Sequence, residues 1–174
     1  EGVCNQYCKM HTNESIRIAV KEWLKDKGKA IEKYGHISTW DISKVTDMKT
    51  LFYNAKSFNE NISNWDVSNV TVMQGMFERA INFNQPLNKW NVSNVTDMRR
   101  MFWATDSFNQ DISNWDVSNV TNMKFMFFGA GSFNQDISNW DVSNVTNMDY
   151  MFRRTDAFNK PLNNWDVSNV TDMS

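Results

Sequence analysis

Three side chains that can bind a metal or form a cross-link lie close together near the N-terminus. They are Cys4, Cys8 and His11, in the order C-x3-C-x2-H. Zinc requires a fourth ligand, and no second pair of donors lies nearby in the sequence to supply it. The alternative is a local disulfide between Cys4 and Cys8, which is favoured if the protein is secreted. We therefore predict no metal site, and the sequence leaves the state of the two thiols open.

Residues suited to catalysis are few. The chain has two histidines, His11 and His36, and both lie outside its repeated part. It contains no G-x-S-x-G, P-loop or H-E-x-x-H motif. Because no nucleophile, base and orienting group stand in a recognisable pattern, we predict a protein that is not an enzyme and needs no cofactor.

Aspartate recurs at intervals of 25 residues in the sequence, except at one such position, where Asn91 takes its place. The aspartates are Asp41, Asp66, Asp116, Asp141 and Asp166. Carboxylates stacked about 5 Å apart repel each other by about 0.8 kcal/mol in water. They would therefore bind a cation or a basic partner, or each would accept hydrogen bonds within the D-x-S-N turn that follows it. Turn chemistry is favoured, because D-x-S-N is an ordinary turn sequence.

Asparagines begin an N-V-T sequence in five of the six repeats. They are Asn69, Asn94, Asn119, Asn144 and Asn169. Each matches a glycosylation sequon, but glycans on every repeat would be closer together than their bulk allows. We predict instead that the amides form hydrogen bonds from one repeat to the next.

Aromatic residues occupy some positions that hold polar residues or glycine in other repeats. They are Tyr53, Trp103, Phe125, Phe128 and Tyr150. Because the same positions accept Glu78, Arg100 or Arg153, we expect these aromatic side chains at the surface. Four of them fall in consecutive repeats and should form one patch that binds a partner. The alternative is a scatter of exposed apolar residues, which is common in proteins.

The elements that must position these side chains follow from a repeat of 25 residues. Its markers are Trp40, Trp65, Trp90, Trp115, Trp140 and Trp165. Repeats of this length are typical of solenoids, in which a single unit cannot bury its own apolar face. The apolar residues between Val70 and Ala80 recur at helical spacing, which predicts a short helix in each unit. The W-D-V sequence predicts a short parallel strand with Asp66 pointing outward.

These elements predict an α/β, leucine-rich-repeat-like curved solenoid. Strands pack about 4.8 Å apart and helices about 8–10 Å apart, so the strands should line the concave face and the helices the convex face. Residues 1–36 should form an N-terminal segment with a capping helix that ends before Gly35, followed by a repeat domain over residues 37–174.

The repeated sequence F-N-Q-D-I-S-N-W-D-V-S-N-V-T-N-M-x-x-M-F-x-x-A resembles the BspA-like leucine-rich-repeat surface proteins, including the repeats of mycoplasma lipoproteins. The resemblance covers Trp40 to Met173. It implies a secreted or cell-surface protein without catalytic activity that serves in adhesion or partner binding.

Composition agrees with this interpretation. The net charge of −2 and the absence of a basic run argue against nucleic-acid binding, and no apolar run is long enough to span a membrane. We therefore expect a soluble repeat scaffold for protein or glycan binding or adhesion. The alternative is a structural subunit that docks in a larger assembly through its helical face and its uncovered C-terminal end, which would also allow end-to-end self-association.

Overall fold

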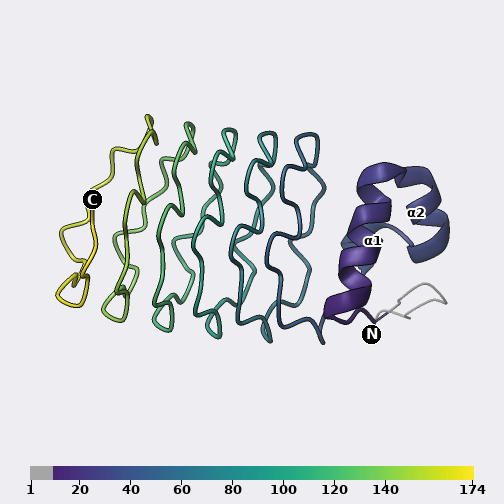
Figure 1. Cartoon of the computed structure of the whole chain (residues 1–174), viewed down its shortest axis with the longest axis horizontal. Helices are drawn as coiled ribbons and strands as arrows, with labels where there is room; N and C mark the ends of the chain where they lie inside the picture. Colours follow the sequence, from purple (N-terminus) through teal and green to yellow (C-terminus); the bar gives the residue numbers. More distant parts are fainter. Residues whose placement is uncertain (1–9) are drawn as a thin grey trace.

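The computed structural model describes residues 10–174, which form two short helices followed by a row of stacked coils (Figure 1). The helices are α1 (Asn13–Lys25) and α2 (Lys27–Tyr34), followed by a single 3-10 turn, η1 (Ile37–Thr39). We number the coils from the tryptophan that begins each one, so that residues 40–174 make five complete coils and the first part of a sixth.

The N-terminal segment contains two helices where the sequence pattern predicted one. Thr12 and Ser15 form a capping box that begins α1. The chain then becomes extended at Asp26, whose carboxylate accepts the backbone N–H of Lys29 at 3.1 Å and so begins α2. Gly35 ends α2 with a φ of 75°, a conformation that suits glycine.

The two helices cover the first coil. The rings of Trp23 and Tyr34 lie 5.8 and 5.9 Å from the ring of Trp40. The Asn13 side chain accepts the backbone N–H groups of Thr46 and Asp47, at 2.9 and 3.1 Å. This end of the stack therefore has both apolar cover and partners for its backbone donors.

The predicted helix in each coil is absent. In coil 2, Val70, Met73, Met76, Phe77 and Ala80 are all buried, as a helix would bury them. The backbone reaches this result through consecutive turns: the N–H groups of Met76, Glu78 and Ala80 each bond three residues back, to Met73, Gly75 and Phe77. The alternate N–H groups of Gly75 and Phe77 bond to Arg99 and Met101 in the next coil.

Left-handed residues explain why these turns cannot become a helix. Each coil has two of them, four residues apart, such as Gly75 and Arg79 in coil 2 or Arg100 and Ala104 in coil 3, with φ between 51° and 69°. An α-helix needs right-handed residues throughout and bonds only within itself. Here half of the N–H groups bond to the neighbouring coil instead.

The predicted W-D-V strand is absent as well. One turn closes from Trp65 to Ile62 and the next from Val70 to Val67, so that only Asp66 lies between them. The β structure found in residues 10–174 consists of isolated parallel bridges. In the coils they join Asp47, Val72, Asp97, Asn122, Asn147 and Asp172 in sequence. The prediction of an α/β leucine-rich-repeat-like solenoid with strands on one face and helices on the other is therefore wrong.

Stacked aromatic rings line the core on both sides. Phe52, Phe77 and Phe102 stack with centroids 5.6 and 5.7 Å apart. On the other side, Trp115 and Trp140 stack at 6.4 Å. The two walls repeat at nearly the same spacing, which leaves no room for helices that need about 8–10 Å. The expected concave strand face and convex helical face therefore do not exist.

Candidate functional site: an aromatic patch on the coils

The repeated polar residues bond one coil to the next. The Asn94 side chain donates to the carbonyl of Ser68 at 2.7 Å. We call equivalent positions in successive coils a register, and the four other asparagines in the Asn94 register make the same contact. The prediction of amide hydrogen bonds between coils is confirmed. A second register does similar work, since the Asn84 side-chain oxygen accepts the backbone N–H of Asn109 at 3.0 Å.

The aspartates of the W-D-V sequence form turns. Asp141 accepts the backbone N–H of Ser143 at 3.0 Å and its hydroxyl at 2.6 Å. The same backbone contact occurs at Asp41, Asp66, Asp116 and Asp166. The Ser143 hydroxyl and N–H hold the pKa of Asp141 below its ordinary value, although the neighbouring Asp166 carboxylate opposes this. Serine donors outweigh the repulsion between adjacent carboxylates.

This aspartate register shows no convergence of ligands. Asp66, Asp116, Asp141 and Asp166 are exposed, and Asp41 is half-buried. Within residues 10–174, no three side chains of His, Cys, Asp or Glu come together in a way that could hold a metal ion. What the structure shows for these residues is turn formation.

Four of the five predicted partner-binding aromatics come together. Trp103, Phe125 and Tyr150 stack along three successive coils, with ring centroids 5.8 and 5.4 Å apart and interplanar angles of 19° and 21°. Phe128 lies edge-on to both Trp103 and Phe125, at 5.7 Å from each. We call Trp103, Phe125, Phe128 and Tyr150 the aromatic patch. All four side chains are half-buried.

Cations lie over the rings of the aromatic patch. The Arg100 guanidinium is 4.5 Å from the Trp103 ring and 5.4 Å from the Phe125 ring. Arg79 lies 6.0 Å from Trp103, and Arg153 lies 5.1 Å from Tyr150. Lys124 lies 5.0 Å from Phe125 and also pairs with Asp149 at 2.6 Å. These distances are those of cation–π contacts.

Sequence reasoning missed the role of these cations. Arg100 occupies the register of Phe125 one coil earlier, and Arg153 occupies the register of Phe128 one coil later. A cationic residue that lies one repeat before or after an aromatic residue, at the same position of the repeat, is therefore the sequence signal that could have predicted these cation–π contacts.

Tyr53 is separate from the aromatic patch. It occupies the register of Trp103 but lies two coils earlier, with Glu78 between them, and it is 48% exposed. No ring contact joins Tyr53 to the patch among the aromatic pairs of the described residues. It is an exposed aromatic residue in the same register, which makes it a useful control.

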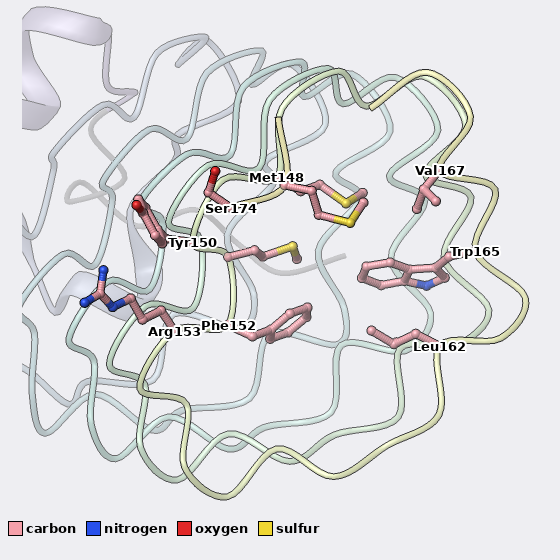
Figure 2. Close-up of a pocket in the computed structure, with 10 residues that line it drawn as sticks. Met148, Tyr150, Phe152, Arg153, Leu162, Trp165, Val167 and Ser174 are labelled. Atoms are coloured by element: carbon pink, nitrogen blue, oxygen red, sulfur yellow. The ribbon is translucent and has the colours of Figure 1, made fainter. Parts of the chain in front are cut away.

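A pocket of about 600 Å³ lies at the last coil. Figure 2 shows Met148, Phe152, Leu162 and Trp165 around it, with Tyr150 and Arg153 at one side. Val167 and Met173, which also line it, are 39% and 56% exposed. This end face of the stack is apolar and adjoins the aromatic patch through Tyr150.

The cysteines and histidines near the N-terminus lie partly outside the described residues. Cys4 and Cys8 lie outside the described residues, so the disulfide between them stays one of the two alternatives that the sequence leaves open. His11 is buried, with its ring 4.9 Å from the ring of Trp40 and Nδ1 3.3 Å from the Ser15 hydroxyl. His36 contacts Ser38 and the edge of Trp23, within the segment that covers the first coil.

Comparison with known proteins identifies the repeats. The model of one protein family matches the chain twice, over residues 21–117 and 89–174. No match was found among curated proteins or among solved structures. Within residues 10–174, no helix has the length and apolarity needed to cross a membrane. Because the two matches together span most of the sequence, the chain belongs to the family described as "Mycoplasma protein of unknown function, DUF285".

Proposed function

We propose that this protein is a non-catalytic extracellular or cell-surface scaffold that binds a protein or glycan partner through the aromatic patch. The observation that carries the proposal is the stacking of Trp103, Phe125 and Tyr150, with cations over their rings, at positions where the repeat does not require aromatic residues.

Recurring and variable positions within each coil have different roles, and this difference supports the proposal. The polar residues that recur from coil to coil form contacts between coils, as Asn94 and Asn84 do, or turns, as Asp141 does. Those side chains serve the stack itself. We therefore propose that a partner is recognised by side chains in the variable registers, which differ from coil to coil.

The backbone at the aromatic patch adds a second argument. Phe125 and Tyr150 have φ values of 58° and 52°, in a register where coil 2 has Gly75. A left-handed conformation costs a residue other than glycine about 1–2 kcal/mol. Thr50 and Arg100 adopt the same conformation in this register, so the cost belongs to the fold of every coil, and an aromatic residue is not needed to form the turn. Aromatic residues and arginine are also enriched at protein interfaces.

The extracellular or surface location rests on the repeat sequence. Its resemblance to BspA-like surface proteins supports a protein that meets partners outside the cell. Membership of the DUF285 family agrees with a mycoplasma-type repeat, and the family's description names no function.

A second candidate function is structural assembly through the C-terminal end face. The apolar pocket at the last coil and the exposed side chains of Val167 and Met173 favour it. In this alternative, the end face docks against a second copy or another subunit, and the aromatic patch is part of the contact through Tyr150.

Capture with matched variants tests the proposed function. Wild-type protein, the double variant Trp103→Ser/Phe125→Gly and the control Tyr53→Ser are immobilised and exposed to an extract of cell-surface and matrix proteins and to a glycan array. Phe125→Gly removes a strained residue, so the double variant is expected to fold, which circular dichroism checks. We expect partners that bind wild type and Tyr53→Ser and are lost from the double variant. Equal retention by all three proteins would contradict the proposal.

A further inference from the structure

We infer that the aromatic patch binds an acidic, extended segment of a partner protein. This inference rests on the proposed function, because it names the chemistry of the partner at the same site. It follows from which parts of the rings remain accessible, from the charges around them, and from the length of the site.

The faces of the stacked rings are already occupied. Phe125 lies between Trp103 and Tyr150, nearly parallel to both. Arg100 covers Trp103, and Arg153 covers Tyr150. Sugars and nucleobases bind aromatic residues by stacking on open ring faces. The rings therefore offer their edges to a partner, and ring edges carry partial positive charge.

The charges that reach solvent at the patch are also positive. Arg79 and Arg153 are exposed, and Arg100 is half-buried. The acidic groups nearby, Glu78 and Asp149, are only 8% and 5% exposed. Positive ring edges and guanidinium groups together match carboxylates, and arginine binds carboxylates through two parallel hydrogen bonds. The whole protein has a net charge of −2, so attraction of an acidic segment must come from this local group of cations.

The site is long and narrow in the direction of the stack. Its cations and rings come from four successive coils, from Arg79 in coil 2 to Arg153 in coil 5. At about 4.8 Å per coil, this length is on the order of 14 Å, which four or five residues of extended peptide would span at about 3.3 Å each. A segment with several carboxylates can therefore contact the cations of successive coils at once.

Fluorescence anisotropy with defined probes tests the inference. The first probe is a labelled ten-residue peptide of alternating Glu and Gly, and the second is the same peptide with Gln in place of Glu. Chondroitin sulfate, added as a competitor and measured directly by calorimetry, represents an acidic glycan. Each measurement uses the 174-residue protein at low and at high salt.

Two double variants separate local from general charge effects. Arg79→Gln/Arg153→Gln removes the cations at the two ends of the aromatic patch. Lys25→Gln/Lys89→Gln removes the same charge from exposed positions on α1 and at the end of coil 2. We expect the first pair to weaken binding of the acidic peptide by about tenfold or more, because two arginines that pair with carboxylates are lost together. The second pair should change it by less than about twofold.

The outcomes bear separately on the inference and on the proposed function. Binding of the Glu peptide that weakens with salt, exceeds that of the Gln peptide and is lost in Arg79→Gln/Arg153→Gln supports the inference. No binding of the Glu peptide up to millimolar concentration, or equal binding of both peptides, overturns it. Binding of chondroitin sulfate alone, sensitive to the same variant, overturns the peptide partner and leaves a binding function at the patch intact. Failure of the capture experiment above would count against the proposed function itself.

Discussion

At the residue scale, each coil combines side chains that maintain the stack with side chains that vary. Asn109 and Asp141 have roles that recur from coil to coil. Asn109 accepts a backbone N–H group of the next coil, which would otherwise be unpaired, and Asp141 holds a turn within its own coil. Glu78 is different. It occupies a register that holds aromatic residues or arginine in other coils, and it is buried beside the cations of the patch.

The substitution Glu78→Gln should stabilise the protein at neutral pH. Burial raises the pKa of Glu78, and the nearby Arg100 and Arg79 only partly oppose this. When the pKa of a carboxyl is higher in the folded than in the unfolded protein, ionisation of that carboxyl destabilises the fold. This destabilisation is fully present at pH values above the folded-state pKa. The destabilisation disappears as the pH falls to about 4, near the ordinary pKa of a glutamate side chain. Melting temperatures of both proteins at pH 7 and pH 4 measure the difference, and a less stable variant at pH 7 would show that the arginines dominate.

At the element scale, the unit of this fold is the coil of linked turns. Each coil forms backbone hydrogen bonds within its turns at alternate residues, and bonds to the next coil at the residues between them. Asparagine side chains extend this pattern where the backbone alone cannot. Asn109 accepts the backbone N–H of Asn134 at 2.9 Å and the side-chain amide of Gln135 at 2.8 Å. The stability of a coil therefore depends on the coil that follows it.

Replacement of this amide should destabilise the stack. Asn109→Ala leaves the N–H of Asn134 without its acceptor, and we expect the free energy of unfolding to fall by about 1 kcal/mol. The matched control is Asn159→Ala, in the same register of coil 5, whose side-chain oxygen accepts no hydrogen bond from any of residues 10–174. Urea denaturation of the three proteins measures both effects. Equal losses for the two variants would mean that the amide acts on its own coil rather than on the next one.

At the scale of the whole molecule, the two ends of the stack differ. The N-terminal end is covered by α1 and α2, while the opposite end presents Leu162 of coil 5 and Trp165 of the sixth coil around an apolar pocket (Figures 1 and 2). In a stack of repeats, each interface between neighbours contributes its own stabilising free energy. A surface of this kind therefore favours any additional element that can bury it.

An added segment after Ser174 should stabilise the protein. A copy of residues 150–164 continues the register of the sixth coil and would cover the half-buried Phe152, Phe158 and Leu162 of coil 5. Because burial of a large apolar side chain contributes about 1.5–3 kcal/mol, we expect a gain of about 2 kcal/mol or more and a higher melting temperature.

The control for this prediction is a Gly/Ser extension of the same length, which should change the melting temperature little. Light scattering on the same proteins tests assembly through the end face. Self-association of the 174-residue chain should decrease when the copied segment is present. Equal association with and without the segment would argue against this second candidate function.

The candidate site was partly accessible from sequence. A 25-residue alignment separates registers that are always apolar from registers that vary, which placed Trp103, Phe125, Phe128 and Tyr150 on the surface in consecutive coils. It did not show that Trp103, Phe125 and Tyr150 stack face to face, nor that Arg100 and Arg153 lie over the rings. Those contacts depend on the direction in which each side chain leaves its turn, which side-chain type alone does not specify. Arg100, Phe125 and Tyr150 leave it from left-handed residues.

The sequence by itself determined the period of the chain and which side chains enter the core, because burial follows from apolar character repeated in every unit. Val70, Met73, Phe77 and Ala80 are inside, as their spacing requires. Only the tertiary structure decided the path of the backbone between them. Spacing of three and four residues fits a helix and a series of linked turns equally well, and the choice depends on hydrogen bonds such as that from Phe77 to Met101, 24 residues away in the next coil. Coils at the close spacing of these bonds cannot accommodate helices, so the contacts between coils, rather than local helix propensity, determine the fold.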